Sequence, residues 1–381
     1  MEKAAASRFE ELIRSEFERI ERMKLDTTVT DFKTLEKIVV GVLPGDGIGP
    51  IIMEQALRVM HLLLDDELAS GRIELRPVEG MTIENRAAKN ESLPSECLDE
   101  IKKCNVLIKG PMVTPTPADS WPNLISANSM LRRSLDLFAA VRPIRMKDKG
   151  IDWTFFRENI EGEYIFGNKG IQVNDDLAID FKVETSPGSE RIARAAFEFA
   201  KANGKKNVTA VTKSTIVKLT DGNFAKAVHR VGEDYPEIQV EDRLVDAMAA
   251  KMLDPEFNAG LEVFVLPNLY GDIITDIAAE LQGGLGSAGS SNLGNRYAMF
   301  EAIHGTAPYL IAHDRAEYAN PCSLIRAAGM LIGHIGFPDR KTRLEDALDV
   351  ADTEKKVVLT TFREDASTAG YTDYLLEILS R

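Results

Sequence analysis

Two aspartates lie four residues apart in the segment NLYGDIITD, where a helical pattern begins after a short apolar run. At that spacing Asp272 and Asp276 face the same way on a helix, and their like charges repel unless a cation lies between them. Carboxylate oxygens are the ligands that Mg²⁺ and Mn²⁺ prefer, and the sequence has no His and Cys cluster of the kind that binds zinc. The pair predicts a divalent-metal site, although Asp272 also stands where a structural helix cap would.

Arginines in two other segments are candidates for binding an anion. The stretch SANSMLRRSLDLFAAVRP contains Arg132, Arg133 and Arg142, and FFRENIEGEY contains Arg157. Planar guanidinium groups bind carboxylates in a bidentate manner, so converging arginines would suit a substrate with two or three carboxylates. Spacing alone leaves open whether these arginines converge or form ordinary surface ion pairs.

The composition limits the classes of protein to which the chain can belong. A length of 381 residues favours two domains, and 44% hydrophobic residues are enough for a full core. The net charge of −14 argues against nucleic-acid binding, and no apolar run is long enough to cross a membrane. The N-terminus is too acidic for a targeting peptide, and three scattered cysteines suit a reducing compartment. We therefore expect a cytoplasmic protein with a small-molecule partner.

The elements that must position these residues alternate between strands and helices. Short apolar runs that predict strands lie at 38–44, 105–111, 208–213 and 263–268. Helical periodicity follows at 189–204 and 320–336, which indicates an α/β protein with a largely parallel sheet. An amphipathic helix is also expected near the N-terminus, with a capping box of Ser7 and Glu10 at its start and the main fold beginning near Ile38.

The glycine-rich segments do not fit a Rossmann dinucleotide fold. GDGIGP follows a strand but lacks the required G-x-G-x-x-G spacing, whereas GLGSAG at 284–289 has the spacing but follows a helical stretch. The loop at 283–294 can still line a cofactor, because glycines let backbone N–H groups approach phosphates.

Taken together, these motifs resemble those of the isocitrate and isopropylmalate dehydrogenases, which are β-decarboxylating dehydrogenases. The resemblance runs from about residue 38 to 335 and rests on motifs that appear in family order. They are IVVGVLPGDGIGP, LIKGPMVTP, LRRSLDLFAAVRP, FFRENIEGEY, VTKSTIVKLTDG, NLYGDIITDIAAELQGGLG, NLG and EAIHGTAP followed by ANP.

The resemblance implies a two-domain α/β fold that is not Rossmann. It places an N-terminal helical extension at 1–36, a large cofactor-side domain at 37–137 and 288–381, and a small domain with a dimer-forming segment at 138–287. Members are homodimers with shared active sites, so the resemblance also implies a homodimer here.

The same resemblance implies a role for particular residues. Asp272 and Asp276, with Asp246 of the partner subunit, would hold Mg²⁺ or Mn²⁺. Tyr164 and Lys213 of the partner subunit would be the catalytic pair. The substrate would be bound by Ser126, Asn128, Arg132, Arg142 and Arg157. The cofactor would lie along Thr114, the GGLG loop, Glu301, His304, Gly305, Thr306, Ala307, Pro308 and Asn320.

Substrate and cofactor choice depend on a few positions. Ser126 and Asn128 are polar where isopropylmalate enzymes are apolar, which favours isocitrate because buried donors facing an alkyl group would go unpaired. The long loop at 114–126 and Thr215 depart from the family pattern, so isopropylmalate, homoisocitrate and tartrate stay open. No basic clamp for a 2′-phosphate is evident, which favours NAD, with NADP left open by Arg315. A non-catalytic regulatory subunit is the rival interpretation, and the retained catalytic residues argue against it.

Overall fold

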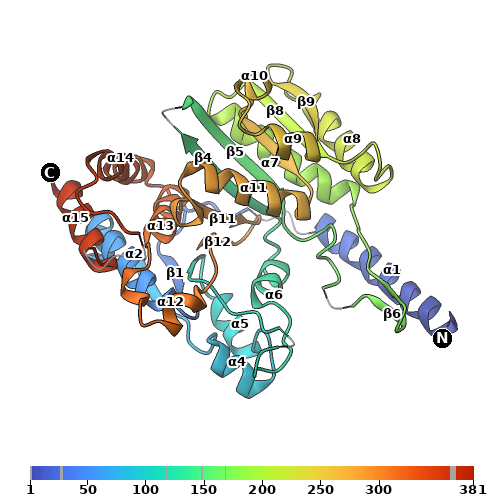
Figure 1. Ribbon diagram of the computed structural model, residues 1–381, viewed down its shortest axis with the longest axis horizontal. Coiled ribbons are helices and arrows are strands. Elements are labelled where there is room, and N and C mark those ends of the chain that lie inside the picture. The colour runs from blue at the N-terminus through green and yellow to red at the C-terminus, as the bar shows by residue number, and fades with distance from the viewer. Residues whose placement is uncertain (1, 26–28, 117, 147–148, 168, 361–365) are drawn as a thin grey trace. The chain divides into compact units, whose positions relative to one another are not determined.

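The computed structural model describes residues 2–25, 29–116, 118–146, 149–167, 169–360 and 366–381 (Figure 1). The chain divides into two compact units. The first unit consists of Met1–Val29 and Asp136–Ala278, and the second consists of Thr30–Leu135 and Ala279–Arg381. Each unit is an α/β layer structure with its own strands, and the fold is the mixed α/β class that the sequence predicts.

The strands of the second unit are mainly parallel and lie in the order β2-β1-β3-β12-β11. Strand β1 pairs in parallel with β2 and β3, β3 pairs in parallel with β12, and β11 pairs antiparallel with β12. The strands span Ile38–Leu43 (β1), Ile73–Pro77 (β2), Val106–Lys109 (β3), Gly289–Leu293 (β11) and Ala298–Ala302 (β12). Helices of this unit are α2 (Gly49–Leu63), α3 (Asp65–Ala69), α4 (Ile83–Lys89), α5 (Ser95–Ile101), α6 (Ala127–Ser134), α12 (Pro308–Ala312), α13 (Cys322–His334), α14 (Pro338–Glu354) and α15 (Thr368–Ser380).

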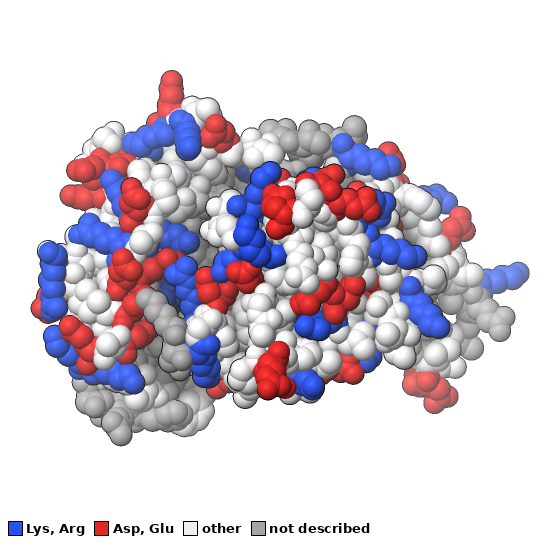
Figure 2. Space-filling view, turned by 90° about the horizontal axis from the view of Figure 1, so that it is seen from above, with Lys and Arg blue, Asp and Glu red and all other residues white. Residues whose placement is uncertain are grey.

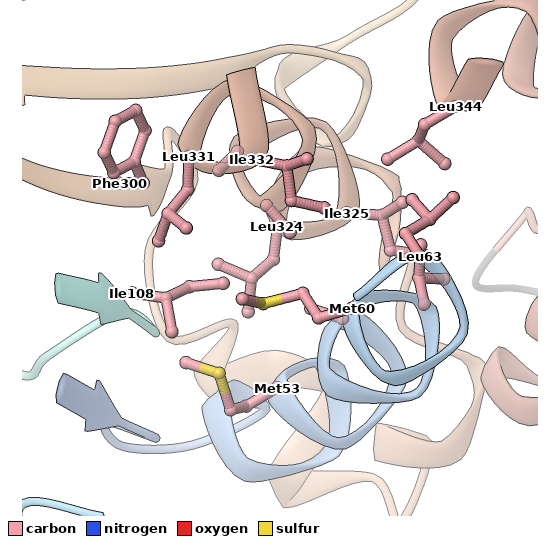
Figure 3. Packing of buried hydrophobic residues seen from close by; sticks show 14 of the residues in the cluster. Met53, Met60, Leu63, Ile108, Phe300, Leu324, Ile325, Leu331, Ile332 and Leu344 are labelled. Atoms are coloured by element: carbon pink, nitrogen blue, oxygen red, sulfur yellow. The ribbon is translucent and has the colours of Figure 1, made fainter. Parts of the chain in front are cut away.

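The core of the second unit lies between these strands and the helices α2 and α13. All six residues of β1 and all four of β3 are buried, as expected for parallel strands covered on both faces. Figure 3 shows Met53 and Met60 of α2 facing Leu324 of α13 and Ile108 of β3. Dense packing of this kind gives the loops that follow the strands a rigid support.

The first unit contains a second set of strands in the order β4-β5-β10-β8-β9. Strands β4 and β5 are antiparallel, and the pairs β5–β10, β10–β8 and β8–β9 are parallel. Their bounds are Ala139–Met146 (β4), Ile151–Glu158 (β5), Asn207–Thr212 (β8), Gln239–Leu244 (β9) and Val263–Leu266 (β10). The helices are α7 (Ser186–Ala202), α8 (Thr220–Gly232), α9 (Val245–Lys251), α10 (Pro255–Asn258) and α11 (Asn268–Gln282), whose last four residues belong to the second unit.

The N-terminal helix belongs to the first unit, where it contacts a two-stranded hairpin. Helix α1 (Glu2–Leu25) lies beside β6 (Ile171–Asn174), which pairs antiparallel with β7 (Leu177–Ile179). Phe9 stacks on Phe181 with ring centroids 5.3 Å apart. The expected start at the Ser7 capping box is wrong, because the helix begins five residues earlier and Ser7 lies inside it. The alanine run that precedes Ser7 has the highest helix propensity and carries the helix through that position.

The surface carries charges of both signs. On the face shown in Figure 2, lysines and arginines are interspersed with aspartates and glutamates. None of the helices in the described part of the chain is long and apolar enough to span a membrane.

Candidate functional site

The two aspartates lie on α11, one and two turns after its start. Strand β10 leads directly into this helix, and its last residue, Leu266, pairs with Arg157 near the end of β5. Because β5 and β10 are parallel, their carboxyl ends meet at the same edge of the sheet, which brings Arg157 beside the start of α11. The predicted helix that carries both aspartates is therefore present and faces a predicted substrate arginine.

Arg157 is almost fully buried, and its guanidinium group contacts α11. Its Nε and Nη2 donate to Asn268 Oδ1 at 3.0 and 2.6 Å, and Nη1 forms an ion pair with Asp272 Oδ1. A Cβ atom at Gly271 would lie 2.5 Å from Arg157 Cγ, so only glycine lets the arginine stem lie across the helix there. The segment NLYGD thus supplies three features that hold Arg157. Asn268 accepts its hydrogen bonds, Gly271 leaves room for its stem, and Asp272 pairs with its charge.

Arg142 lies on β4 and contacts the next turn of α11. Its Nη1 donates to Thr275 Oγ1 at 2.5 Å and to Asp276 Oδ1 at 2.9 Å, and its Nη2 lies 3.7 Å from Asp272 Oδ1. Burial and the neighbouring Asp272 carboxylate raise the pKa of Asp276, and Arg142 opposes that shift. Both arginines therefore supply positive charge to a carboxylate pair that would otherwise repel itself.

These two carboxylates fit a hard divalent cation, which takes oxygen ligands. Among the described residues, no group of three or more His, Cys, Asp or Glu is arranged to hold a metal within one chain. Asp246, the predicted third ligand, instead lies on α9 with its Oδ1 2.6 Å from Lys213 Nζ. A single chain offers the pair Asp272 and Asp276, and a third carboxylate would have to come from elsewhere.

Tyr164 joins the same cluster. Its hydroxyl donates to Asp272 Oδ2 at 3.1 Å, and its ring centroid lies 5.7 Å from Arg157 Cζ. Burial and the Asp272 carboxylate raise the pKa of Tyr164, so its hydroxyl keeps the proton at neutral pH. A half-exposed proton donor next to a carboxylate pair and two arginines is suited to acid catalysis on an anionic substrate.

Lys213 follows β8 and is held by its backbone as well as its side chain. Its N–H donates to Asp221 Oδ2 at 2.6 Å, and that carboxylate is fully buried against Lys182 Nζ at 2.5 Å. The Lys213 side chain pairs with Asp246 rather than with Tyr164 or Asp272. The predicted catalytic pair is thus not assembled within one chain, although both members are present in the first unit.

The remaining predicted substrate residues belong to the second unit. Ser126 is the N-cap of α6, where its Oγ accepts from Ser129 N at 3.4 Å. The Oδ1 atom of Asn128 is buried and has no hydrogen-bond partner among the described residues. Arg132 donates through Nη2 to Glu301 Oε1 at 3.0 Å, while its buried Nε has no partner in the described part of the chain.

Glu301 is the centre of a buried ion network rather than an exposed ligand. Its carboxylate lies 2.8 Å from Lys109 Nζ and 3.0 Å from Arg132 Nη2, and it also accepts from Asn292 Nδ2 at 2.7 Å. Burial acts to raise the pKa of Glu301, but Lys109 and Arg132 hold that pKa far below its usual range. Its contacts in the structure are to these cations, and a cofactor role stays a prediction.

Two of the predicted cofactor segments of the second unit contact glycine-rich segments. The backbone oxygen of Thr306 accepts from Ile48 N at 3.2 Å, which joins the HGTAP segment to the GDGIGP turn. The side chain of Asn320 flanks Gly286 of the glycine loop, where an added Cβ would lie 3.4 Å from Asn320 Nδ2. Thr114 is exposed in the loop after β3.

His304 fits a ligand-binding role by its hydrogen bonding. Its Nδ1 lies 2.9 Å from Gly305 O, and its buried Nε2 has no partner among the described residues. Burial lowers the pKa of His304, which keeps the ring neutral. The neighbouring Gly305 has open space where a side chain would be, and Ala307 has a left-handed backbone that begins α12. The unpaired Nε2 of His304, next to the open space at Gly305, suits the binding of a nucleotide cofactor.

Several residues that shape the site were not singled out from the sequence. Asn268 holds Arg157, Lys109 holds Glu301, and Asp221 holds the backbone of Lys213. Lys109 could have been identified from the sequence, because it is a charged residue at the end of an apolar strand segment, LIKGP. Asn268 and Asp221 had none, since asparagine and aspartate are ordinary residues at helix starts.

The chain is similar to known proteins over most of its length. The family model for isocitrate/isopropylmalate dehydrogenase matches residues 39–374. A mitochondrial regulatory subunit of the NAD isocitrate dehydrogenase of Dictyostelium discoideum is 36% identical over 348 residues, covering 89% of this chain and 91% of that protein. The NADP isocitrate dehydrogenase of Rickettsia bellii is 34% identical, covering 88% and 68% respectively.

A solved structure extends the likeness to the fold. The crystal structure of isocitrate dehydrogenase from Methylococcus capsulatus superposes with a TM-score of 0.79 at 32% sequence identity, covering 90% of this chain and all of that one. The family match spans most of the chain and includes both units. The chain belongs to the isocitrate/isopropylmalate dehydrogenase family of NAD(P)-dependent decarboxylating dehydrogenases.

Proposed function

We propose that the chain catalyses the metal-dependent oxidative decarboxylation of isocitrate to 2-oxoglutarate, with reduction of NAD or NADP. The observation that carries the proposal is the cluster of Tyr164, Arg157 and Asp272, in which a proton donor and an arginine share one carboxylate. Arg142 and Asp276 repeat the arginine–carboxylate contact one turn along α11.

In this proposal the arginines bind the substrate and the aspartates hold the metal ion. Arg142 and Arg157 bind the carboxylates of the substrate, because their guanidinium groups are held in place by buried contacts. Asp272 and Asp276 hold the divalent ion, Mg²⁺ or Mn²⁺. When bound, that ion stabilises negative charge on the substrate oxygen, and the nicotinamide accepts the hydride.

Two side chains move the protons. Lys213, acting uncharged, takes the proton of the substrate hydroxyl either directly or through a water. After loss of CO₂, Tyr164 gives its proton to the enol carbon, and the raised pKa of its hydroxyl means that this proton is present at neutral pH. The reaction thus uses a base and an acid on different elements of the first unit.

We propose that the active form is a homodimer in which each site borrows Lys213 and Asp246 from the partner subunit. Support comes from the contact between these two residues, which pair with one another in a single chain and leave Tyr164 and Asp272 without a base or a third ligand among the described residues. A second copy that brings both residues to the aspartate pair would complete the site in one step.

Isocitrate and NAD are the proposed choices within the family. Ser126 and the buried Asn128 Oδ1 line the start of α6 with polar atoms, which disfavour the alkyl group of isopropylmalate. NAD is proposed because the segment after HGTAP shows no clear clamp for a 2′-phosphate, while Arg315 leaves NADP as the alternative. The three cysteines are all free and buried, which suits the proposed cytoplasmic location.

The decisive measurement is kcat/KM of the purified chain for isocitrate, isopropylmalate, homoisocitrate and tartrate, with NAD and NADP in turn and with Mg²⁺ present. The proposal predicts the highest value for isocitrate. A higher value for isopropylmalate would overturn the interpretation of Ser126 and Asn128. No turnover of any acid by the chain alone would favour a regulatory subunit, the role named for the Dictyostelium relative.

Complementation tests the shared site. We expect Tyr164→Phe and Lys213→Met each to reduce kcat by about 10²-fold or more as homodimers. Co-refolding the two variants creates mixed dimers in which one site has both wild-type residues, so about a quarter of wild-type activity should return. If each site is built from a single chain, mixing restores nothing.

A further inference from the structure

The N-terminal helix carries an arginine that reaches into the first unit. Arg19 Nη2 lies 2.6 Å from Glu161 Oε1, and its Nε donates to Glu16 Oε2 at 2.9 Å. The Arg19 side chain is 15% exposed, whereas that of Glu161 is fully buried. Helix α1 lies outside residues 39–374, so this contact comes from a part of the chain that the family match does not cover.

Glu161 lies among other acidic side chains, and Arg19 is the cation that contacts its carboxylate. Its carboxylate accepts from the backbone and the hydroxyl of Thr185, the N-cap of α7, at 2.8 and 2.6 Å. The buried Glu158 and Glu184 are its electrostatic neighbours, and both Glu184 oxygens lack hydrogen-bond partners among the described residues. Removing one partner of a buried ion pair leaves an uncompensated charge. Removing Arg19 should therefore cost more free energy than removing an exposed arginine.

A chain of hydrogen bonds leads from Glu161 to the proposed substrate arginine. The Glu161 backbone oxygen accepts from Asn268 Nδ2 at 2.8 Å, and Asn268 Oδ1 accepts from Nε and Nη2 of Arg157. Asn268 is 1% exposed and bonded at both ends of its amide, so it cannot turn without breaking one contact. The position of the Arg157 guanidinium follows that of the Glu161 backbone.

The Glu161 backbone is fixed from two sides. The carboxylate of Glu158 accepts the N–H groups of Ile160 and Glu161, and the Glu161 side chain is anchored on Thr185 and Arg19. If Arg19 is lost, the donors that remain to the Glu161 carboxylate among the described residues are the backbone N–H and hydroxyl of Thr185, and both are neutral. A shift of this segment then moves Asn268 and, through it, Arg157.

We infer that Arg19 is a positioning residue for substrate binding, acting through Glu161 and Asn268 on Arg157. The inference rests on the proposed role of Arg157 as a ligand of the substrate's carboxylates. It assigns a function to the N-terminal helix beyond packing on the β6–β7 hairpin. The affected quantity should be affinity for the acid substrate, because the residues predicted to bind the cofactor belong to the second unit.

The test compares four variants of the full chain with wild type in the Mg²⁺-dependent reaction with isocitrate. Arg19→Ala should raise KM for isocitrate by about 5- to 50-fold, while KM for the nicotinamide cofactor stays within about twofold. Arg14→Ala is the matched control, since Arg14 is on the same helix, is 72% exposed and pairs only with Glu10 among the described residues. It should leave both constants unchanged.

Two further variants separate charge from folding. Arg19→Lys keeps a charged donor and should restore most of the substrate affinity, whereas Arg19→Gln, which is neutral, should not. If Arg19→Ala does not fold, this Lys and Gln pair decides the question. A loss of folded protein alone would lower apparent kcat and leave both KM values unchanged, so that result counts against the inference.

The outcomes distinguish this inference from the proposed function. Wild type that is inactive on isocitrate but active on another acid overturns the substrate assignment only, and the variants are then compared on that acid. Wild type inactive on every acid overturns the proposed function, and the comparison is then made by calorimetric binding of Mg²⁺–isocitrate, where Arg19→Ala should weaken binding. Unchanged substrate affinity in active Arg19→Ala overturns the inference.

Discussion

The buried glutamates Glu301 of the second unit and Glu158 of the first have opposite electrostatic surroundings. In the second unit Glu301 contacts Lys109 and Arg132, which hold its pKa far below the usual range. In the first unit Glu158 accepts backbone N–H groups on one oxygen, and its other oxygen has no partner among the described residues. Burial, aided by the Glu161 charge, raises the pKa of Glu158 to about 8.

The difference shows that burial by itself does not decide the charge of a carboxyl group. Two cations at hydrogen-bonding distance keep Glu301 ionised and tie α6 to the strands β3 and β12. Glu158 has no cation at hydrogen-bonding distance among the described residues, and with a pKa of about 8 it is mostly protonated at neutral pH. The nearby Glu161 forms an ion pair with Arg19. The second unit compensates the charge of Glu301 with residues of β3 and α6, whereas in the first unit Arg19 of the N-terminal helix contacts Glu161.

The largest expected effect comes from removing a cation of the second unit. Lys109→Met leaves the Glu301 carboxylate buried with one cation fewer and should reduce the free energy of unfolding by about 3–5 kcal/mol. Chemical denaturation measures the loss. Lys103→Met, which breaks an exposed ion pair with Glu100, is the control and should change it by less than about 1 kcal/mol. Equal effects would remove the distinction between the buried and exposed pairs.

Neutralising the two buried glutamates should have unequal effects at pH 7. Glu301→Gln leaves Lys109 and Arg132 without their carboxylate and should lower stability by about 2–3 kcal/mol. Glu158→Gln removes the need to protonate a carboxyl group that is ionised in the unfolded chain at pH 7, so we expect no loss of stability and a gain of up to about 3 kcal/mol. Thermal unfolding of both variants tests the contrast, and a Glu158→Gln loss as large as that of Glu301→Gln would contradict it.

The pH dependence of stability should differ in the same way. The folded-state pKa of Glu158, about 8, lies above the unfolded value of 4.5, so its contribution is full below pH 4.5 and is lost as pH rises to about 8. Between pH 6 and 8, wild type should therefore lose about 2 kcal/mol that Glu158→Gln does not, at about 1.36 kcal/mol per pH unit. Parallel stability curves for the two proteins would show that Glu158 is ionised in the folded state.

The smallest effect concerns the packing of the acidic cluster on α7. A Cβ atom at Gly188 would lie 2.3 Å from Glu161 Oε1, so Gly188→Ala must displace that carboxylate and should cost about 1–2 kcal/mol. Gly222 on α8 is the control, because nothing lies within 4 Å of its added Cβ. Gly222→Ala should be neutral or stabilising by up to about 1 kcal/mol. If both substitutions stabilise the protein, the carboxylate is free to move.

Much of the framework could be predicted from the sequence. The apolar runs at 38–44, 105–111, 208–213 and 263–268 correspond to β1, β3, β8 and β10, because buried parallel strands read as continuous hydrophobic segments. The helix that carries Asp272 and Asp276 was also expected. The failure of the Rossmann spacing rule correctly excluded that fold, and the family motifs supplied the alternative that the comparisons confirm.

The pairings within the site could not be predicted. Arg132 meets Glu301 across 169 positions of sequence, and Arg157 meets Asn268 across 111. Such contacts depend on how strands are ordered and on which side chains are buried, and neither leaves a local pattern. The start of α1 was missed for the opposite reason, because a local capping pattern competed with an alanine run of higher helix propensity.

The contact between Arg19 and Glu161 has a consequence for anyone who shortens this protein. Boundaries chosen by homology would begin near Val39, retain every family motif and still delete the guanidinium that neutralises Glu161. The shortened enzyme would keep all the residues that we propose to be catalytic, and we expect it to bind its acid substrate with lower affinity. The family match begins at residue 39, and the arginine that contacts Glu161 lies some twenty residues earlier.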